Sequence, residues 1–230
     1  MKTIGLIGGM SWESTVGYYQ IINRTVKEEL GGLHSAKCIL YSVDFQEIEE
    51  CQARGDWDKS AIILSQAAQS LEKAGADFIV ICTNTMHKVA GEIEKSISIP
   101  ILHIAEVTAR QLLQNGIARV ALLGTRYTME QDFYKSKLIQ QNIEVLIPNE
   151  QDRAFVNDVI YHELCLGILS AESKAGFLKV VDKLTEQGAQ GVILGCTEIG
   201  MLIQNGDTAA PLYDTTEIHA KSAVLYALEQ

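Results

Sequence analysis

The segment that decides the fold is GADFIVICTNT, residues 75–85, in which a run of apolar residues ends in a polar triplet. A second segment, GAQGVILGCTE at 188–198, repeats this order of Gly-Ala, apolar run and polar end 113 positions later. Short continuous apolar runs with β-branched residues are typical of strands that are covered on both faces. Each segment therefore predicts a buried strand with polar residues at its carboxyl end.

The repeat extends beyond these two segments. TIGLIGGM (3–10) resembles RVALLGTR (119–126), and PILHIAEVTA (100–109) resembles PLYDTTEIHA (211–220). Three similar pairs in the same order indicate an internal repeat, whereas one pair alone could reflect any strand-turn-helix unit. The chain is therefore predicted to hold two similar halves that divide near residue 115.

Strands and helices are expected to alternate along the chain, which predicts an α/β fold with parallel sheets. Helical periodicity predicts helices at 59–74 and 153–169, and Gly75 and Gly188 stand where a glycine after a helix is expected. Two pseudo-symmetric domains of this kind are expected to face one cleft at the carboxyl ends of their strands. Apolar runs predict strands at 3–8, 37–43, 78–82, 99–102, 120–124, 144–147, 192–195 and 212–213.

Composition excludes several classes of function. The 230 residues include 47% hydrophobic and 21% charged residues, with a net charge of −10, and the length suits two domains of about 110 residues. An acidic chain without Lys/Arg clusters is expected to bind neither nucleic acid nor a membrane surface, and its apolar runs fall short of the roughly 20 residues of a membrane span. No signal peptide is predicted. The scattered cysteines favour a reducing cytoplasm over disulfides or a zinc site.

Aligning the two Gly-Ala pairs identifies the equivalent positions of the two halves. The alignment places Cys82 opposite Gly195 and Thr83 opposite Cys196. Adjacent residues of a strand face opposite sides, so Cys82 is expected to point away from the site. The first-half counterpart of Cys196 is therefore Thr83.

Cys196 is the first candidate catalytic residue. A helix beginning just after it is expected to lower the pKa of the thiol from about 8.5 towards neutrality. Thr197 and Glu198 would then offer hydroxyl and backbone N–H donors to an anion. The alternative is a buried cysteine that packs as a small apolar group, and the repeat favours the functional interpretation.

The triplet Thr83, Asn84 and Thr85 has two compatible interpretations. It is either an ordinary cap for a helix that begins near Met86, or a group of hydroxyls and amides that binds a carboxylate. The segment GLIGGMSWEST (5–15) lacks the Gly-Lys-Ser/Thr of a phosphate loop, so a turn that lets the backbone approach a small ligand is the preferred interpretation.

The other polar residues give no further site. His87 and His219 are predicted to be cap or surface residues, and the five histidines show no metal-ligand spacing, so no metal site is predicted. The Gly-x-Ser-x-Gly motif of serine hydrolases is absent.

The motifs ICTNTMH, LGCTEI, GLIGGMSWEST and LLGTRYTM resemble the aspartate/glutamate racemase superfamily, and most closely its aspartate racemase branch. This branch includes bacterial L-aspartate/glutamate-specific and broad-specificity amino-acid racemases, and the likeness runs over nearly the whole chain. The resemblance implies two pseudo-symmetric α/β domains with the active site between them, commonly in a homodimer, and no cofactor. It also implies that the C-terminal helix returns to the first domain. The expected first domain is therefore 1–103 plus 210–230, and the expected second domain is 104–209.

The resemblance further implies a mechanism with two acid/base groups. In that family two cysteines flank the substrate Cα: one thiolate removes the proton and the other thiol returns one on the opposite face. Cys196 takes the place of the second cysteine, and Thr83 stands where the first would be. Because a hydroxyl is far less acidic than a thiol, Thr83 is expected to donate or relay a proton. The implied enzyme acts on L-amino acids with Cys196 as base and is slow in reverse.

The substrate contacts are also implied by the resemblance, and the substrate expected is aspartate or glutamate, or a wider range of polar amino acids. Gln52 is neutral, so Arg54 and His162 are the candidates for binding an acidic side chain. Two alternatives stay open: a one-cysteine relative that is a decarboxylase or a cis–trans isomerase, and a non-catalytic amino-acid-binding protein. The implied substrate-binding residues are Met10, Gln52, Asn84, Thr85, Thr125, Thr128, Thr197 and Glu198.

Overall fold

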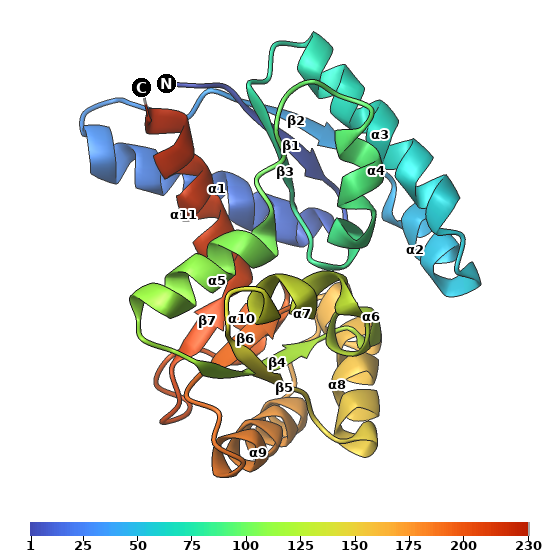
Figure 1. The fold of residues 1–230 in the computed structure, drawn as a ribbon, viewed down its shortest axis with the longest axis vertical. Helices are drawn as coiled ribbons and strands as arrows, with labels where there is room; N and C mark the ends of the chain where they lie inside the picture. Colours follow the sequence, from blue (N-terminus) through green and yellow to red (C-terminus); the bar gives the residue numbers. More distant parts are fainter. Residues whose placement is uncertain (230) are drawn as a thin grey trace. The chain divides into compact units, whose positions relative to one another are not determined.

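The computed structural model describes residues 1–229, and these form two compact units that each hold one parallel sheet (Figure 1). The prediction of an α/β fold with two parallel sheets is confirmed. The first unit comprises Met1–Ile104 and the residues from His219 onward, and the second comprises Ala105–Ile218. The second unit extends past the expected end at residue 209, because β7 (Leu212–Asp214) pairs with β6 (Val192–Gly195) in its sheet.

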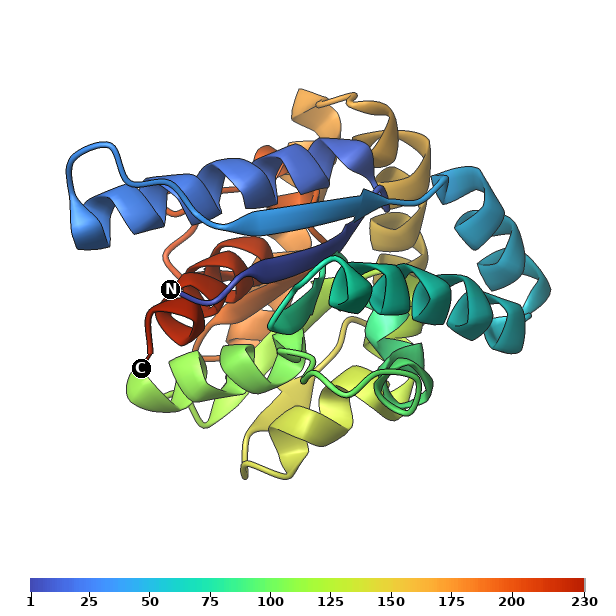
Figure 2. The same ribbon diagram turned by 90° about the horizontal axis from the view of Figure 1, so that it is seen from above.

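The sheet of the first unit has the strand order β2-β1-β3, with all pairs parallel. Ile101 forms only an isolated bridge with Ile79, where a strand was predicted at 99–102. Helix α1 runs alongside the sheet (Figure 2), and residues of α1, β1 and α11 pack in one apolar cluster. The strands are β1 (Ile4–Gly8), β2 (Cys38–Ser42) and β3 (Phe78–Ile81), and the helices are α1 (Trp12–Leu30), α2 (Phe45–Arg54), α3 (Trp57–Lys73), the 3₁₀ helix η1 (Thr85–Val89), α4 (Ala90–Glu94) and α11 (Thr215–Leu228).

Side chains of β3 alternate between the two faces of this sheet, as the pleat of a strand requires. Val80 and Cys82 pack with Tyr18 of α1, whereas Ile79 and Ile81 belong to the cluster on the other face, which α3 covers. Cys82 is completely buried, and burial raises the pKa of its thiol far above the usual value. It therefore behaves as a small apolar core residue.

The sheet of the second unit has the order β5-β4-β6-β7, also entirely parallel. Helices α8 and α9 pack in one cluster against this sheet. The helix predicted at 153–169 is instead α8 (Glu150–His162), capped by Asn149, and it ends because Glu163 departs from helical dihedral angles. The other elements are β4 (Arg119–Gly124), β5 (Glu144–Leu146), α5 (Ile104–Gln114), α6 (Arg126–Glu130), α7 (Asp132–Ile139), the 3₁₀ helix η2 (Leu164–Leu166), α9 (Ala171–Glu186) and α10 (Ile199–Leu202).

Three strands of each sheet share one topology, since β2-β1-β3 matches β5-β4-β6 while β7 is added in the second sheet, and this is the structural form of the sequence repeat. In the first, Ile7 of β1 pairs with Ile81 of β3, and in the second, Leu123 of β4 pairs with Leu194 of β6. The glycines that follow α3 and α9 also match, since Gly75 and Gly188 have φ of 96° and 97°, the left-handed region that favours glycine. The register thus gives Thr83 and Cys196 equivalent places, two residues beyond the paired positions.

Among the helices of the described chain, none is long and apolar enough to cross a membrane.

Candidate functional site

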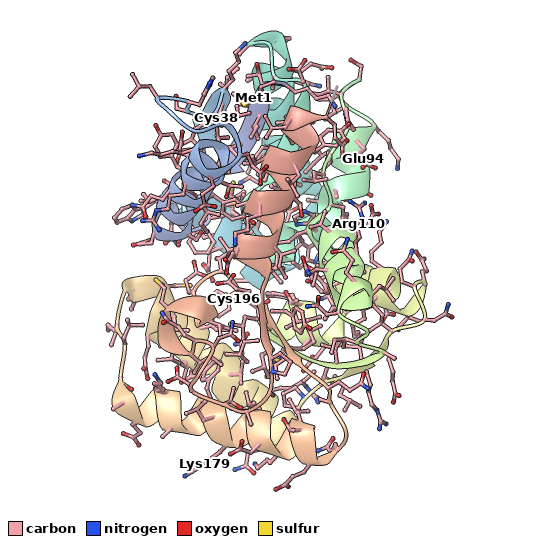
Figure 3. The ribbon with its side chains drawn as sticks, turned by 90° about the vertical axis from the view of Figure 1, so that its left-hand side faces the viewer. Met1, Cys38, Glu94, Arg110, Lys179 and Cys196 are labelled. Carbon is pink, nitrogen blue, oxygen red and sulfur yellow. The ribbon has the colours of Figure 1, made fainter. Side chains whose placement is uncertain are left out.

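The carboxyl end of β6 carries a hydrogen-bonded thiol and carboxylate. Cys196, labelled in Figure 3, directly follows β6, and its Sγ donates to Glu198 Oε2 at 3.0 Å. The hydroxyl of Thr197 donates to the same oxygen at 2.6 Å. Cys196 and Glu198 are only 8% and 3% exposed. A buried carboxylate oxygen that accepts two hydrogen bonds is strongly oriented, so it is held ready to accept the thiol proton.

The pKa of the Cys196 thiol is raised well above its usual value, mainly by burial and next by the charge of Glu198. The expectation of a lowered pKa was wrong because burial disfavours the charged thiolate, and two further features of the site add to this. The following helix, α10, has only four residues, and a short helix concentrates little positive charge at its N-terminus. The carboxylate beside the sulfur also disfavours a second negative charge. The resting thiol is therefore protonated at neutral pH.

Glu198 was expected to offer its backbone N–H to a substrate anion, which stays a prediction, while its carboxylate is directed at Cys196 and Thr197. A carboxylate repels a substrate carboxylate, and its geometry here suits proton transfer with the thiol.

Thr125 and Thr128 lie beside the same strand end. Thr125 caps α6 by accepting a hydrogen bond from the Thr128 backbone N–H at 3.3 Å, and the two hydroxyl oxygens are 3.2 Å apart. A Cβ at Gly195 would lie 3.3 Å from Thr128 Cγ2 and 2.7 Å from the Leu123 carbonyl oxygen. The glycine before Cys196 therefore allows this close packing, which brings the predicted residues of the second unit together.

The predicted residues of the first unit gather at the end of β3. Thr83 is half-buried in a bend after the strand, and Asn84 and Thr85 are buried. Gln52 Nε2 donates to the sulfur of Met86 at 3.0 Å, and Met10 packs in the same cluster as Met86. Asn84 precedes η1, but its side chain makes no capping hydrogen bond to that helix, so the predicted side-chain cap is not formed by Asn84.

The two cationic candidates lie on exposed helix surfaces. Arg54 pairs with Glu50 at 3.1 Å, and its side chain is 72% exposed. His162 pairs with Asp158 at 2.8 Å, and its side chain is 74% exposed. Each is engaged with a carboxylate one turn earlier in its own helix, so neither joins the buried residues of its unit.

The glycine turn after β1 is shaped by the chain itself. Gly9 has φ of 91°, and a Cβ there would collide with the carbonyl oxygen of Val43. The Gly9 N–H donates to the Thr15 hydroxyl at 2.9 Å, and that hydroxyl donates to the Ser11 carbonyl at 2.8 Å. The glycine was expected to let the backbone approach a small ligand. In the structure, the close approach that Gly9 permits is to the loop after β2.

Comparison with known proteins fits this geometry. The chain matches the Asp/Glu/Hydantoin racemase family over residues 7–223. It belongs to this family. The resemblance drawn from the sequence motifs is thereby confirmed, and since racemases are isomerases, the protein is an enzyme of that class.

Individual racemase relatives align over almost their full length. The broad specificity amino-acid racemase RacX of Bacillus subtilis is 25% identical over 224 residues, which is 96% of each chain. A crystal structure from Yersinia pestis, described as a candidate Asp/Glu racemase, is 58% identical with a TM-score of 0.93 and full coverage of both chains. An aspartate racemase homologue from Pyrococcus horikoshii is 35% identical, with a TM-score of 0.87 and full coverage of both chains.

Sequence reasoning missed a buried histidine cluster in the first unit of this racemase-family protein. His87 and His219 were predicted at caps or on the surface, yet they are 3% and 0% exposed. Their ring centroids are 5.7 Å apart, and the ring of His103 lies 4.6 Å from that of His87. The only available signal was the four-residue spacing of Thr83 and His87, which places both on one side of a helical turn. Within the described residues, no group of three or more His, Cys, Asp or Glu could hold a metal.

Burial in this cluster predicts that the protein loses stability as the pH falls from 6.5 to 5. Burial lowers the pKa of His219 to about 3 and that of His87 well below its usual value, whereas unfolded histidines titrate near 6.5. The unfolded state therefore gains protons in this window and the folded state does not. The free energy of unfolding should fall by up to about 1.4 kcal/mol per pH unit for each histidine.

Urea unfolding at pH 7, 6 and 5 measures this slope. His219→Gln should make it shallower, and His34→Gln, at an exposed position, is the matched control that should leave it unchanged. A variant at position 219 with the wild-type slope would contradict the prediction.

Proposed function

We propose that the protein is a cofactor-independent amino-acid racemase that removes and returns the proton at the substrate Cα. The observation that carries this proposal is the buried hydrogen bond from the Cys196 thiol to Glu198, in a chain of the racemase family. Inverting a carbon requires a base and an acid on opposite faces of that carbon, and each such group typically contributes about 10²–10⁴-fold to the rate. A thiol with an oriented proton acceptor can supply one of them without a cofactor.

The proton first moves from Cys196 Sγ to Glu198 Oε2, which leaves a thiolate and a neutral carboxylic acid. The ammonium group of an amino acid would favour this step, because a nearby positive charge lowers the pKa of a thiol. The thiolate then takes the proton from Cα of the L-enantiomer, and the electron pair remains on the substrate as a carbanion. A thiol whose pKa is raised gives a strongly basic thiolate, which suits a weakly acidic C–H bond.

Thr83 is proposed to complete the inversion by passing a proton to the opposite face of Cα. Its hydroxyl gives a proton to the carbanion and takes one from a water molecule, and the hydroxide that remains is neutralised when Glu198 releases to solvent the proton it took from Cys196. Removal of a proton from the D-enantiomer requires the reverse relay and should be slow. The equilibrium of a racemisation stays near one, so the asymmetry lies in the rates for the two enantiomers.

The proposed substrates are aspartate, glutamate and a wider range of polar amino acids. Support comes from the names of two relatives, a broad-specificity amino-acid racemase and an aspartate racemase homologue. Gln52 is buried and neutral, while Arg54 and His162 are exposed and paired, which favours a range beyond acidic side chains. We also propose that the protein acts as a homodimer in the cytoplasm. The cytoplasmic location is supported by the five cysteines, which are all free thiols, as expected in a reducing compartment.

Hydrogen exchange tests the reaction directly. In D₂O the wild type should introduce deuterium at Cα of L-aspartate, L-glutamate or a neutral L-amino acid, as followed by mass spectrometry. Cys196→Ala should reduce this exchange by at least about 10²-fold, because the base is lost. Cys38→Ala, a half-buried cysteine of β2, is the control and should behave as wild type.

The outcome also separates the alternatives. If no L-amino acid gains deuterium, the racemase proposal fails and a decarboxylase or cis–trans isomerase becomes the better interpretation. Loss of turnover with retained ligand binding in Cys196→Ala would exclude a merely ligand-binding protein.

Glu198→Gln should have two effects of opposite sign. Removing the carboxylate charge should lower the pKa of Cys196, so alkylation by iodoacetamide should be faster at a given pH. Removing the proton acceptor should lower kcat by about 10²-fold. Glu172→Gln, at an exposed first turn of α9, is the matched control. Equal or higher kcat in Glu198→Gln would exclude a role for this carboxylate in proton transfer.

Thr83→Cys should increase turnover of the D-enantiomer by about tenfold or more, because a thiol of pKa near 8.5 can act as a base where a hydroxyl cannot. Thr83→Val keeps the shape and removes the hydroxyl, so it should form little D-product from the L-enantiomer. Rates for both enantiomers are measured by chiral chromatography. An unchanged D-enantiomer rate in Thr83→Cys would mean that another group returns the proton.

A further inference from the structure

We propose that His87 is a positioning residue that fixes the backbone at Thr83 and ties it to Ile104, the residue at which the chain leaves the first unit. This inference rests on the proposed function, because it concerns the group that would return the proton. His87 lies four residues after Thr83 and belongs to the 3₁₀ helix η1.

The hydrogen bonds of His87 define its tautomer. Its Nε2 lies 3.2 Å from the backbone nitrogen of Ile104, and a backbone N–H can only donate, so Nε2 accepts and carries no proton. Its Nδ1 lies 2.8 Å from the carbonyl oxygen of Thr83, which can only accept, so Nδ1 carries the proton and donates. His87 is therefore a neutral Nδ1–H imidazole that bridges two backbone groups.

Burial makes this bridge costly to break. His87 is 3% exposed, and a buried polar group that loses its hydrogen-bond partner is strongly destabilising. Burial, with the neighbouring His103 and His219, also lowers the pKa of His87 well below its usual value, which keeps the ring uncharged. Thr83 lies beyond the last paired residue of β3, so the ladder of the sheet does not hold its carbonyl. The imidazole supplies that missing restraint.

A second histidine of the cluster, His219, is hydrogen-bonded to the segment before Ile104. His219 Nε2 donates to the Leu102 carbonyl at 2.8 Å, and its Nδ1 accepts from the Tyr18 hydroxyl at 2.9 Å. His219 is thus the opposite tautomer, with its proton on Nε2. The chain leaves the first unit after Ile104 and re-enters it at His219. His87 thus contacts both Thr83 and the exit point at Ile104, whereas the hydrogen bonds of His219 are to Tyr18 and Leu102.

Two conservative variants separate the two bonds of His87. The amide nitrogen of Asn can occupy the place of Nδ1 and donate to Thr83, whereas the longer side chain of Gln reaches the place of Nε2 and loses that bond. The measured quantity is the amount of D-product formed per deuterium introduced into the remaining L-substrate. Exchange into the L-enantiomer needs Cys196 and its proton acceptor Glu198, whereas D-product needs Thr83 as well.

His87→Gln should lower this ratio by about tenfold with little change in L-exchange, and His87→Asn should lower it much less. His219→Gln, an equally buried change in the same cluster, should leave the ratio unchanged. A role that is only structural would lower both rates together in all three variants. An unchanged ratio in His87→Gln, or an equal loss in His87→Asn, would overturn the role of His87.

Nitrogen-15 NMR of the wild type tests the bridge without any variant. The spectrum should show His87 protonated at Nδ1 and His219 protonated at Nε2 at pH 7, and an Nε2–H signal for His87 would overturn the inference. A wild type that forms no D-amino acid and exchanges no deuterium would instead refute the proposed function, and with it the catalytic role of His87. The two failures are therefore distinguishable.

Discussion

The register between paired strands is the constraint on which the rest of the structure depends. Ile7 pairs with Ile81 and Leu123 pairs with Leu194, so Thr83 and Cys196 each lie two residues beyond an equivalent pair, although pairing in the second sheet continues to Gly195. The backbone groups of a buried strand are satisfied in the ladder, and the chain turns away where that ladder ends. Thr83 and Cys196 occupy that position in their own units, which is why residues of so different chemistry are structural equivalents.

Local electrostatics then decide what each equivalent position can do. At the end of β6 the thiol is buried beside Glu198, so its pKa is raised and its proton already points at an acceptor. At the end of β3 the side chain is a half-buried hydroxyl whose backbone is fixed by a neutral imidazole. One unit thus holds a group suited to strong base chemistry, and the other a group suited to relaying a proton. In the reaction proposed above, this difference would make the rates for the two enantiomers unequal.

Much of the fold followed from short-range patterns. Apolar runs located the paired strands, although the run at 99–102 forms only a bridge at Ile101. Helical periodicity predicted a helix to residue 169, whereas α8 ends at His162. The pKa of Cys196 was expected in the wrong direction because the sequence pointed to a helix N-terminus but not to the burial of the thiol beside the Glu198 carboxylate. The length of α10 and the direction of the Glu198 side chain depend on packing, which periodicity does not report.

The sequence by itself determined the repeat, the parallel α/β class, the family motifs and the equivalence of Thr83 with Cys196, because each depends on the order and spacing of residues along the chain. Only the tertiary structure decided which buried polar groups meet. The contacts from His87 to Ile104 and from His219 to Leu102 join segments 17 and 117 residues apart. Such contacts arise when the chain folds back on itself, and they leave no periodic trace in the sequence.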